Sequence, residues 1–334
     1  MRVTVIGAGV TGLAVANALA ERGVAVTLVE RSQTLGGDAA SWLAGGMLAP
    51  FCEGETAEEP VVRLGQRAAE WWESRVPDVV RHGTLVVAPA RDAAELRRFA
   101  ERTMRHVWLD ETEIAALEPD LAGRFRRGLF FTEEAHLDPR QALAALAERL
   151  CSRGGEVVLG LDGTDHPPRG SVVDCRGFGA RNALPDLRPV KGEMVLLRTR
   201  DVALARPVRL AHPRTPLYVV PRGDGLFMVG ATMVEAADWR VTARGVASLL
   251  NAAYALHPAF AEAEVVETGA HLRPAFPDNL PRLRRHGRTL HVNGVFRHGF
   301  LLAPALAEMA ARAVLDPNFV PEMMDEDHRE RASA

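Results

Sequence analysis

Hydrophobic positions follow strand-like and then helix-like spacing along the first thirty residues of the chain. Arg2 to Ile6 is a short run rich in β-branched residues, which predicts a strand. The apolar residues from Leu13 to Ala20 recur at helical spacing, and Gly23 provides a stop for that helix. Val24 to Val29 then predicts a second strand. This order is typical of a parallel βαβ unit.

The rest of the chain shows both periodicities. Helical patterns cover Glu58 to Arg75, Ala93 to Arg105 and about Pro304 to Leu315, and strand patterns cover Gly83 to Ala88, Gly128 to Phe131 and Glu156 to Leu159. Asp138 followed by Pro139 predicts the start of a further helix, because aspartate caps free N–H groups and proline suits the first helical position. The mixture predicts an α/β protein.

A glycine motif lies between the first strand and the first helix. Gly7 allows a tight turn, Gly9 lets the backbone approach a pyrophosphate, and Gly12 lets the helix pack closely on the strand. Glu30 ends the second strand, where a carboxylate can accept hydrogen bonds from a ribose. The complete unit predicts a dinucleotide site but does not distinguish NAD from FAD.

The segment from Ser32 to Pro50 is rich in glycine and alanine, so it can pass close to a bulky planar ligand without obstruction by side chains. Its composition suits a backbone that follows the ribityl chain and pyrophosphate of FAD. A flexible surface loop is the alternative that composition alone leaves open.

Length and composition narrow the class of protein. The 334 residues fit about two domains, and 47% hydrophobic and 25% charged residues are ordinary globular values. A formal net charge of -3 with dispersed arginines argues against nucleic-acid binding. The apolar stretch from Val3 to Ala20 is interrupted by glycines and lacks the features of a signal peptide. We expect no membrane association and a cytoplasmic location.

Three widely spaced cysteines, Cys52, Cys151 and Cys175, form no CxxC motif and have no histidine at ligand spacing. They indicate a reducing compartment and no metal. We interpret them mainly as small buried hydrophobic residues, with a reactive thiol at Cys52 as the alternative.

Several segments resemble the glycine oxidases, which belong to the D-amino-acid oxidase family of FAD-dependent oxidoreductases. Residues 40–50 (ASWLAGGMLAP) resemble the stretch of that family that contacts the flavin, and residues 293–305 (NGVFRHGFLLAPA) resemble its closing segment. The segments 188–194, 217–222 with 228–233, and 272–281 resemble further family motifs in the same order. The resemblance therefore covers nearly the whole chain and favours FAD as the cofactor.

The resemblance implies a Rossmann-like FAD-binding domain with an inserted α+β substrate domain built on an antiparallel sheet. We expect the FAD-binding domain to be discontinuous, over 1–75, 138–188 and 277–325. The substrate domain would then cover 76–137 and 189–276, and 326–334 would form a flexible tail.

The resemblance also implies functional residues. Arg273 would bind the substrate carboxylate, because the planar guanidinium can meet it with two hydrogen bonds. Tyr218 would add a hydrogen bond to that carboxylate, Arg297 would close the site beside the flavin, and Met233 would limit the room for a substrate side chain. The expected FAD contacts are Gly7, Gly9, Val10, Thr11, Gly12, Glu30, Arg31, Ala40, Ser41, Gly45, Gly46, Met47, Leu48, Val158, Gly177, Arg297, His298, Gly299, Phe300, Leu301 and Leu302.

The implied reaction is the oxidative deamination of glycine or a similar small amine, such as sarcosine or a small D-amino acid. Hydride would pass to flavin N5, and the products would be glyoxylate or its imine, ammonia and, with molecular oxygen, hydrogen peroxide. The family also implies a homo-oligomer and a role in thiamine synthesis. Three alternatives stay open: an oxidase or dehydrogenase of another D-amino or secondary amino acid, a non-catalytic flavin-binding homologue, and, from the glycine motif alone, a nicotinamide dehydrogenase.

Overall fold

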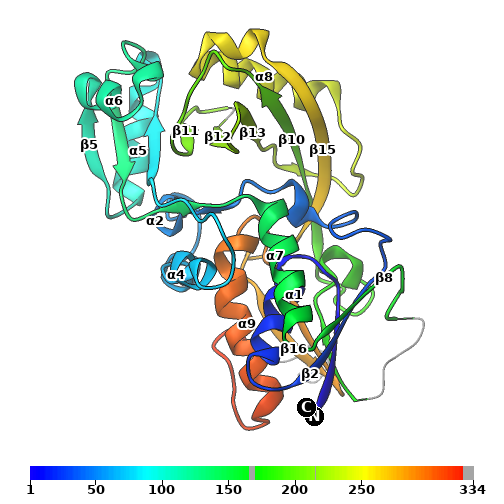
Figure 1. Cartoon of the computed structure of the whole chain (residues 1–334). Helices are drawn as coiled ribbons and strands as arrows, with labels where there is room; N and C mark the ends of the chain where they lie inside the picture. The colour runs from blue at the N-terminus through cyan, green and yellow to red at the C-terminus, as the bar shows by residue number, and fades with distance from the viewer. Residues whose placement is uncertain (165–169, 215, 326–334) are drawn as a thin grey trace.

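The computed structural model describes residues 1–164, 170–214 and 216–325, so the predicted tail, 326–334, lies outside the described residues. Two larger sheets dominate this part of the chain. Figure 1 shows one at the bottom of the view, covered by helices, and the other at the top, where the long strands β10 and β15 run side by side. The fold is mixed α/β, as predicted.

The lower sheet carries the βαβ unit. Its strands are parallel except for the β16–β17 pair, which is antiparallel. The described residues place six strands in it, in the order β16 (Arg282–His286), β17 (Thr289–Asn293), β9 (Ser171–Asp174), β1 (Arg2–Ile6), β2 (Ala25–Glu30) and β8 (Glu156–Leu159).

The upper sheet is antiparallel apart from the parallel pair β11–β4. Its order across the described residues is β14 (Val234–Glu235), β10 (Arg188–Arg198), β13 (Leu226–Gly230), β12 (Leu217–Pro221), β11 (Val208–Leu210), β4 (Thr84–Val87), β6 (Arg127–Phe131) and β5 (Val107–Asp110), with β15 (Glu264–Ala275) paired to β10. A short pair, β3 (Met47–Leu48) with β7 (Ala135–His136), lies outside both sheets.

Helices cover both sheets. Helix α8 contacts β10, β12 and β13 of the upper sheet, whereas α1 contacts α7 and α9 beside the lower sheet. The helices are α1 (Val10–Ala20), α2 (Pro50–Glu53), α3 (Glu59–Gly65), α4 (Ala68–Glu73), α5 (Ala93–Arg102), α6 (Glu111–Leu117), α7 (Pro139–Ser152), α8 (Ala243–Leu256) and α9 (Gly299–Leu315).

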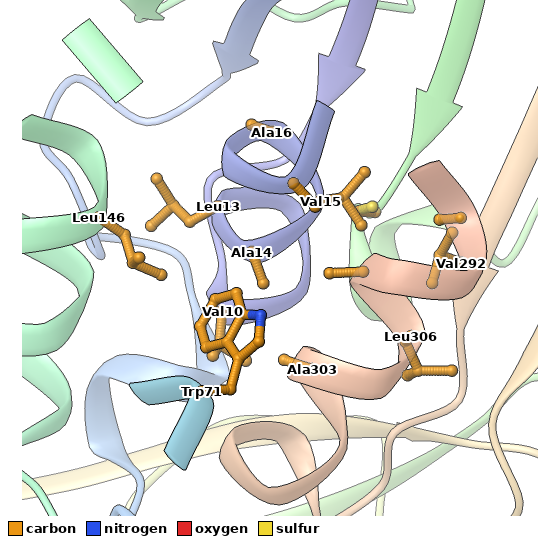
Figure 2. Close-up of a cluster of buried hydrophobic side chains, with 14 of the residues drawn as sticks. Val10, Leu13, Ala14, Val15, Ala16, Trp71, Leu146, Val292, Ala303 and Leu306 are labelled. Atoms are coloured by element: carbon orange, nitrogen blue, oxygen red, sulfur yellow. The ribbon is translucent and has the colours of Figure 1, made fainter. Parts of the chain in front are cut away.

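Helix α1 is the centre of the lower core. Its residues from Val10 to Leu19 are all buried, which explains why they are mostly apolar on every face of the helix. Figure 2 shows Leu13 pointing towards Leu146 of α7, with Ala303 and Leu306 of α9 on the other side. This packing fixes the N-terminus of α1, and with it the glycine turn that precedes the helix.

The prediction that the last helix begins near Pro304 is wrong, because α9 begins at Gly299 and contains Pro304 in its sixth position. Proline has no N–H, so the carbonyl of Phe300, four residues earlier, lacks its helical partner. The buried indole Nε1 of Trp72 donates to that carbonyl at 2.8 Å. The hydrogen bond from α4 therefore makes a proline acceptable inside a buried helix.

The continuous helix predicted over Glu58 to Arg75 is also wrong, since the chain forms α3 and α4 with a break after Gly65. A side chain at Gly65 would lie 2.7 Å from Leu301 of α9. The other predicted helices and strands are present with small shifts at their ends.

The two sheets draw on different parts of the chain. The lower sheet uses strands within 2–30, 156–174 and 282–293, and the upper sheet uses strands within 84–131 and 188–275. On this basis we propose the division into domains given above. Among the described residues, none of the helices has both the length and the apolar character that crossing a membrane requires.

Candidate cofactor and substrate site

A cavity of about 700 Å³ is lined by residues of both sheets and of the loops that join them. Gly7, Gly9 and Glu30 line it from the βαβ unit, and Tyr218 and Arg273 line it from the upper sheet. These sequence-predicted nucleotide and substrate residues thus share one cavity, which lies at the carboxyl ends of β1 and β2, where ligands of such sheets usually bind.

Glu30 fixes the glycine turn. Its carboxylate accepts hydrogen bonds from the backbone N–H groups of Ala8, at 2.8 Å, and Ser32, at 3.0 Å. Gly7 has a φ of +99°, which favours glycine, and a side chain at Gly12 would lie 1.8 Å from the carbonyl oxygen of Gly7. Gly12 therefore supports the turn by close packing and does not line the cavity.

The glycine-rich loop after residue 40 lies against the start of α1. The hydroxyl of Ser41 accepts a hydrogen bond from the N–H of Val10 at 3.2 Å. Further along the loop, the guanidinium of Arg222 donates to the carbonyls of Ala44 and Gly45, both at 2.9 Å, and to that of Leu137 at 2.6 Å. Ser41 and Arg222 together determine the path of this loop.

Arg222 was assigned no role from the sequence, although it ends the apolar run that begins at Leu217. Its side chain is buried, and burial lowers its pKa to about 10 in spite of the nearby negative charge of Asp138. An arginine that closes an apolar strand is the sequence signal that would have indicated such a structural role.

Two helix N-termini face the cavity. Gly299, Phe300 and Leu301 line it at the start of α9, as Val10 and Thr11 do at the start of α1. The first N–H groups of a helix have no partner within the helix, and they carry partial positive charge. Gly9 leaves the backbone open there, because a side chain would have only the Ser41 hydroxyl near it, at 3.6 Å.

This arrangement fits FAD. The turn and the N-terminus of α1 would hold the pyrophosphate, Glu30 would bind the ribose, and the N-terminus of α9 would stabilise negative charge on the flavin. Most of the predicted FAD contacts line the cavity. Four do not line it: Gly12, Leu48, Val158 and Leu302. The FAD contacts as a whole stay predictions.

Arg273 on β15 is a partly buried cation that lines the cavity. Its Nη1 donates to the carbonyl oxygen of Thr232 at 3.0 Å, and no carboxylate among the described residues forms an ion pair with it. Burial lowers the pKa of its guanidinium, and the charge of Arg297 acts in the same direction, although arginine stays protonated in proteins. The Arg273 side chain lies over Gly192 of β10, where a Cβ would be 2.1 Å from Nη2.

Tyr218 lies between two glycines. A Cβ on Gly45 would be 2.8 Å from Cε2 of the ring, and a Cβ on Gly230 would be 2.6 Å from the same atom. Gly45 belongs to the glycine-rich loop and Gly230 ends β13, so the ring packs between the two parts of the cavity. Met233 lies at the rim, half-exposed, with its sulfur 3.8 Å from Nη1 of Arg297.

Glu53 holds Arg297, and sequence reasoning missed it. Its carboxylate accepts from Nε of Arg297 and Nε2 of His298, both at 3.0 Å, and from Nη1 of Arg209 at 3.2 Å. Burial raises its pKa, but the charges of Arg297 and Arg209 and the hydrogen bond from His298 bring the pKa well below its usual range. Arg297 is therefore compensated by a carboxylate, whereas Arg273 is not.

The alternative of a reactive thiol at Cys52 is not supported. Cys52 is fully buried, and both burial and the negative charge of Glu134 raise its pKa. Glu134 is itself buried and accepts from the N–H of Cys52 at 2.7 Å. Burial raises the pKa of Glu134 to about 7.

Three histidines, His271, His291 and His298, lie in or beside the segments 272–281 and 293–305. His291 is buried against Asp174, with Nδ1 3.2 Å from Oδ2, whereas His271 and His298 line the cavity. In the described part of the chain, no group of three or more His, Cys, Asp and Glu residues is arranged to hold a metal ion.

Comparison with known proteins shows the family to which the chain belongs. Residues 2–313 match the family model described as "FAD dependent oxidoreductase", so the chain belongs to this family of FAD-dependent oxidoreductases. The family implies FAD as the cofactor, in agreement with the fit of the cavity.

Individual proteins within this family are similar to the chain. The chain is 59% identical over 324 residues to a protein of Rhizobium etli that carries the name thiamine biosynthesis oxidoreductase ThiO, covering 96% of this chain and 99% of the relative. It is 30% identical to a glycine oxidase of Pseudomonas aeruginosa, covering 93% of each chain. The crystal structure of glycine oxidase from Geobacillus kaustophilus superposes with a TM-score of 0.78 at 26% identity, covering 94% of this chain and 95% of that one.

Proposed function

We propose that this protein catalyses the FAD-dependent oxidative deamination of glycine or a similar small amine, such as sarcosine or a small D-amino acid. The observation that carries the proposal is the environment of the Arg273 guanidinium. It is a partly buried guanidinium that lines the cavity, and no described carboxylate compensates it. Such a group favours an anionic ligand, and its planar fork suits a carboxylate.

The surrounding residues have assigned roles in this proposal. Arg273 binds the substrate carboxylate and Tyr218 donates a hydrogen bond to it. Arg297, held by Glu53, closes the site, and Met233 restricts the substrate side chain. When bound, FAD would accept two electrons from the substrate. Molecular oxygen would then take up these electrons and be reduced to hydrogen peroxide. In this proposal the substrate binds with its amine neutral, and the residues named above orient it. Its hydrogen can then leave as hydride, so no general base is needed.

The similarity to glycine oxidases and to the Rhizobium relative supports a small amine as the substrate. The same relative's name supports a further proposal, that the imine product serves thiamine synthesis. A thiamine-requiring bacterial strain that lacks its own glycine oxidase should grow without thiamine when it expresses the wild-type chain. It should not do so with Arg273→Ala. We also infer a homo-oligomer from the family, which sedimentation would test.

The central experiment follows flavin absorbance under anaerobic conditions after the addition of glycine, sarcosine, D-alanine or D-proline. We expect rapid bleaching with glycine or sarcosine, and peroxide release when oxygen is admitted. Arg273→Lys keeps the charge but loses the fork, so it should bind substrate better than Arg273→Ala and worse than the wild type. A flavin that stays oxidised with every amine would refute the proposal. Bleaching without peroxide would identify a dehydrogenase instead.

A further inference from the structure

The chain between β13 and α8 forms one wall of the cavity. We call residues 232–242 the wall segment. It includes β14, and its side chains Met233 and Trp239 line the cavity although both are more than half exposed. An exposed apolar segment keeps its position only if other groups hold it.

A single buried side chain, that of Glu193 on β10, holds both ends of the wall segment. At one end, Oε2 of Glu193 accepts from the hydroxyl of Thr232 at 3.1 Å. At the other end, Oε1 accepts from the N–H of Thr242 at 2.7 Å and from its hydroxyl at 2.8 Å. Two residues ten positions apart are thus fixed by one carboxylate, whose side chain is only 2% exposed.

Neighbouring groups complete this arrangement. The side chain of Lys191 is also buried, with Nζ 3.9 Å from the Glu193 carboxylate, and it donates to the carbonyl of Arg240 at 3.1 Å. A side chain at Gly245 would lie 2.1 Å from Oε2 of Glu193, so this glycine makes room for the carboxylate at the N-terminus of α8. A carboxylate is stabilised in that position.

The wall segment is also connected to Arg273. The hydroxyl of Thr232 accepts from the N–H of Glu193 at 2.9 Å, and the N–H of Thr232 donates to the carbonyl of Glu193 at 3.2 Å. The carbonyl of the same Thr232 accepts the hydrogen bond from Nη1 of Arg273. Glu193 therefore fixes the group that orients the guanidinium.

We propose that Glu193, supported by Lys191, is a positioning residue that holds the wall segment against the cavity and thereby sets the orientation of Arg273 for carboxylate binding. This inference rests on the proposed function, because it assigns the substrate carboxylate to Arg273. Glu193 itself takes no part in the chemistry and does not need to touch the substrate.

The test compares Glu193→Ala, Glu193→Gln and Thr232→Val with Glu235→Gln in the holoenzyme. Glu235 lies in the same segment, but its side chain is 67% exposed and pairs with Arg188, so it is the matched control. The first measurement is hydrogen–deuterium exchange of amides 232–242, and the second is the Kd of acetate, a carboxylate without an amine, by calorimetry. Steady-state kinetics with glycine gives KM and kcat separately.

For Glu193→Ala we expect faster exchange across the wall segment and a Kd of acetate raised by about tenfold or more, with KM for glycine changed more than kcat. Glu193→Gln should lie between alanine and wild type, because its amide oxygen can still accept from Thr242. Thr232→Val should raise the Kd without loss of bound flavin. Glu235→Gln should match the wild type in every measurement.

Unchanged exchange in both Glu193 variants would overturn the inference, as would faster exchange with an unchanged Kd of acetate. If Glu193→Ala does not fold, Glu193→Gln and Thr232→Val carry the same test. If the wild type binds no acetate and no amine reduces it, the proposed function fails. The exchange measurement then still decides whether Glu193 holds the wall segment.

Discussion

The indole of Trp72 donates to the carbonyl of Phe300, the helical carbonyl that Pro304 leaves without a partner. Trp72→Phe would leave that buried carbonyl unsatisfied, so we expect a loss of about 1–3 kcal/mol in the free energy of unfolding beyond the packing change. Trp71→Phe is the control, because Nε1 of Trp71 is buried with no hydrogen-bond partner among the described residues. Denaturant unfolding of both variants measures the difference. Equal losses would show that the hydrogen bond contributes nothing.

Gly192→Ala should impair substrate binding without unfolding the protein. The new Cβ would meet the end of the Arg273 side chain, which can move, so the change in stability should stay below about 1 kcal/mol. A displaced guanidinium meets the substrate carboxylate poorly, and we expect KM for glycine to rise about tenfold or more. Thermal unfolding measures the change in stability, and steady-state kinetics measures KM. An unchanged KM would contradict the role given to the position of Arg273.

Glu53→Gln should destabilise the protein by about 3–5 kcal/mol at pH 7, because it leaves Arg209 and Arg297 without their buried carboxylate. The folded state lowers the pKa of Glu53, so its stabilisation is present above the ordinary value of 4.5 and is lost as the pH falls towards the folded pKa. The difference between wild type and variant should therefore shrink below about pH 4.5. Unfolding of both proteins from pH 7 to pH 3.5 measures it. A difference that is constant over that range would count against an ionised Glu53.

Glu134 should show the opposite dependence on pH. Its pKa is raised from 4.5 to about 7, so ionisation destabilises the folded state progressively between those values and the effect levels off above pH 7. Glu134→Gln resembles the protonated form, and its stability relative to wild type should increase by about 3 kcal/mol over that range.

Glu133→Gln, at the exposed neighbouring carboxylate, is the control for Glu134 and should show little change with pH. The measurement is chemical unfolding of the three proteins at pH 4.5, 6 and 8. A Glu134→Gln variant that tracks the wild type would mean that Glu134 ionises normally in the fold.

The sequence predicted what depends on local pattern or on the family resemblance. The glycine turn and Glu30 lie within one βαβ unit, so spacing alone indicates their arrangement. Arg273 and Tyr218 are 55 positions apart, and only the resemblance brought them together. Glu53 and Arg222 were missed because their partners, Arg297 and the carbonyls of the glycine-rich loop, are distant in sequence. Similarly, Pro304 predicted a helix start because nothing local reveals that the indole N–H of Trp72 donates a hydrogen bond to the carbonyl of Phe300.

Arg222 directly follows β12 of the upper sheet, yet its guanidinium donates to the carbonyls of Ala44, Gly45 and Leu137, outside that sheet. The ring of Tyr218, four residues earlier, packs against the same Gly45. Reshaping this strand for a larger amine would therefore also reshape the backbone of the glycine-rich loop, which we expect to contact the flavin. Variants selected for a new substrate should be monitored for cofactor retention from the first round, because substrate choice and cofactor binding would depend on the same few residues.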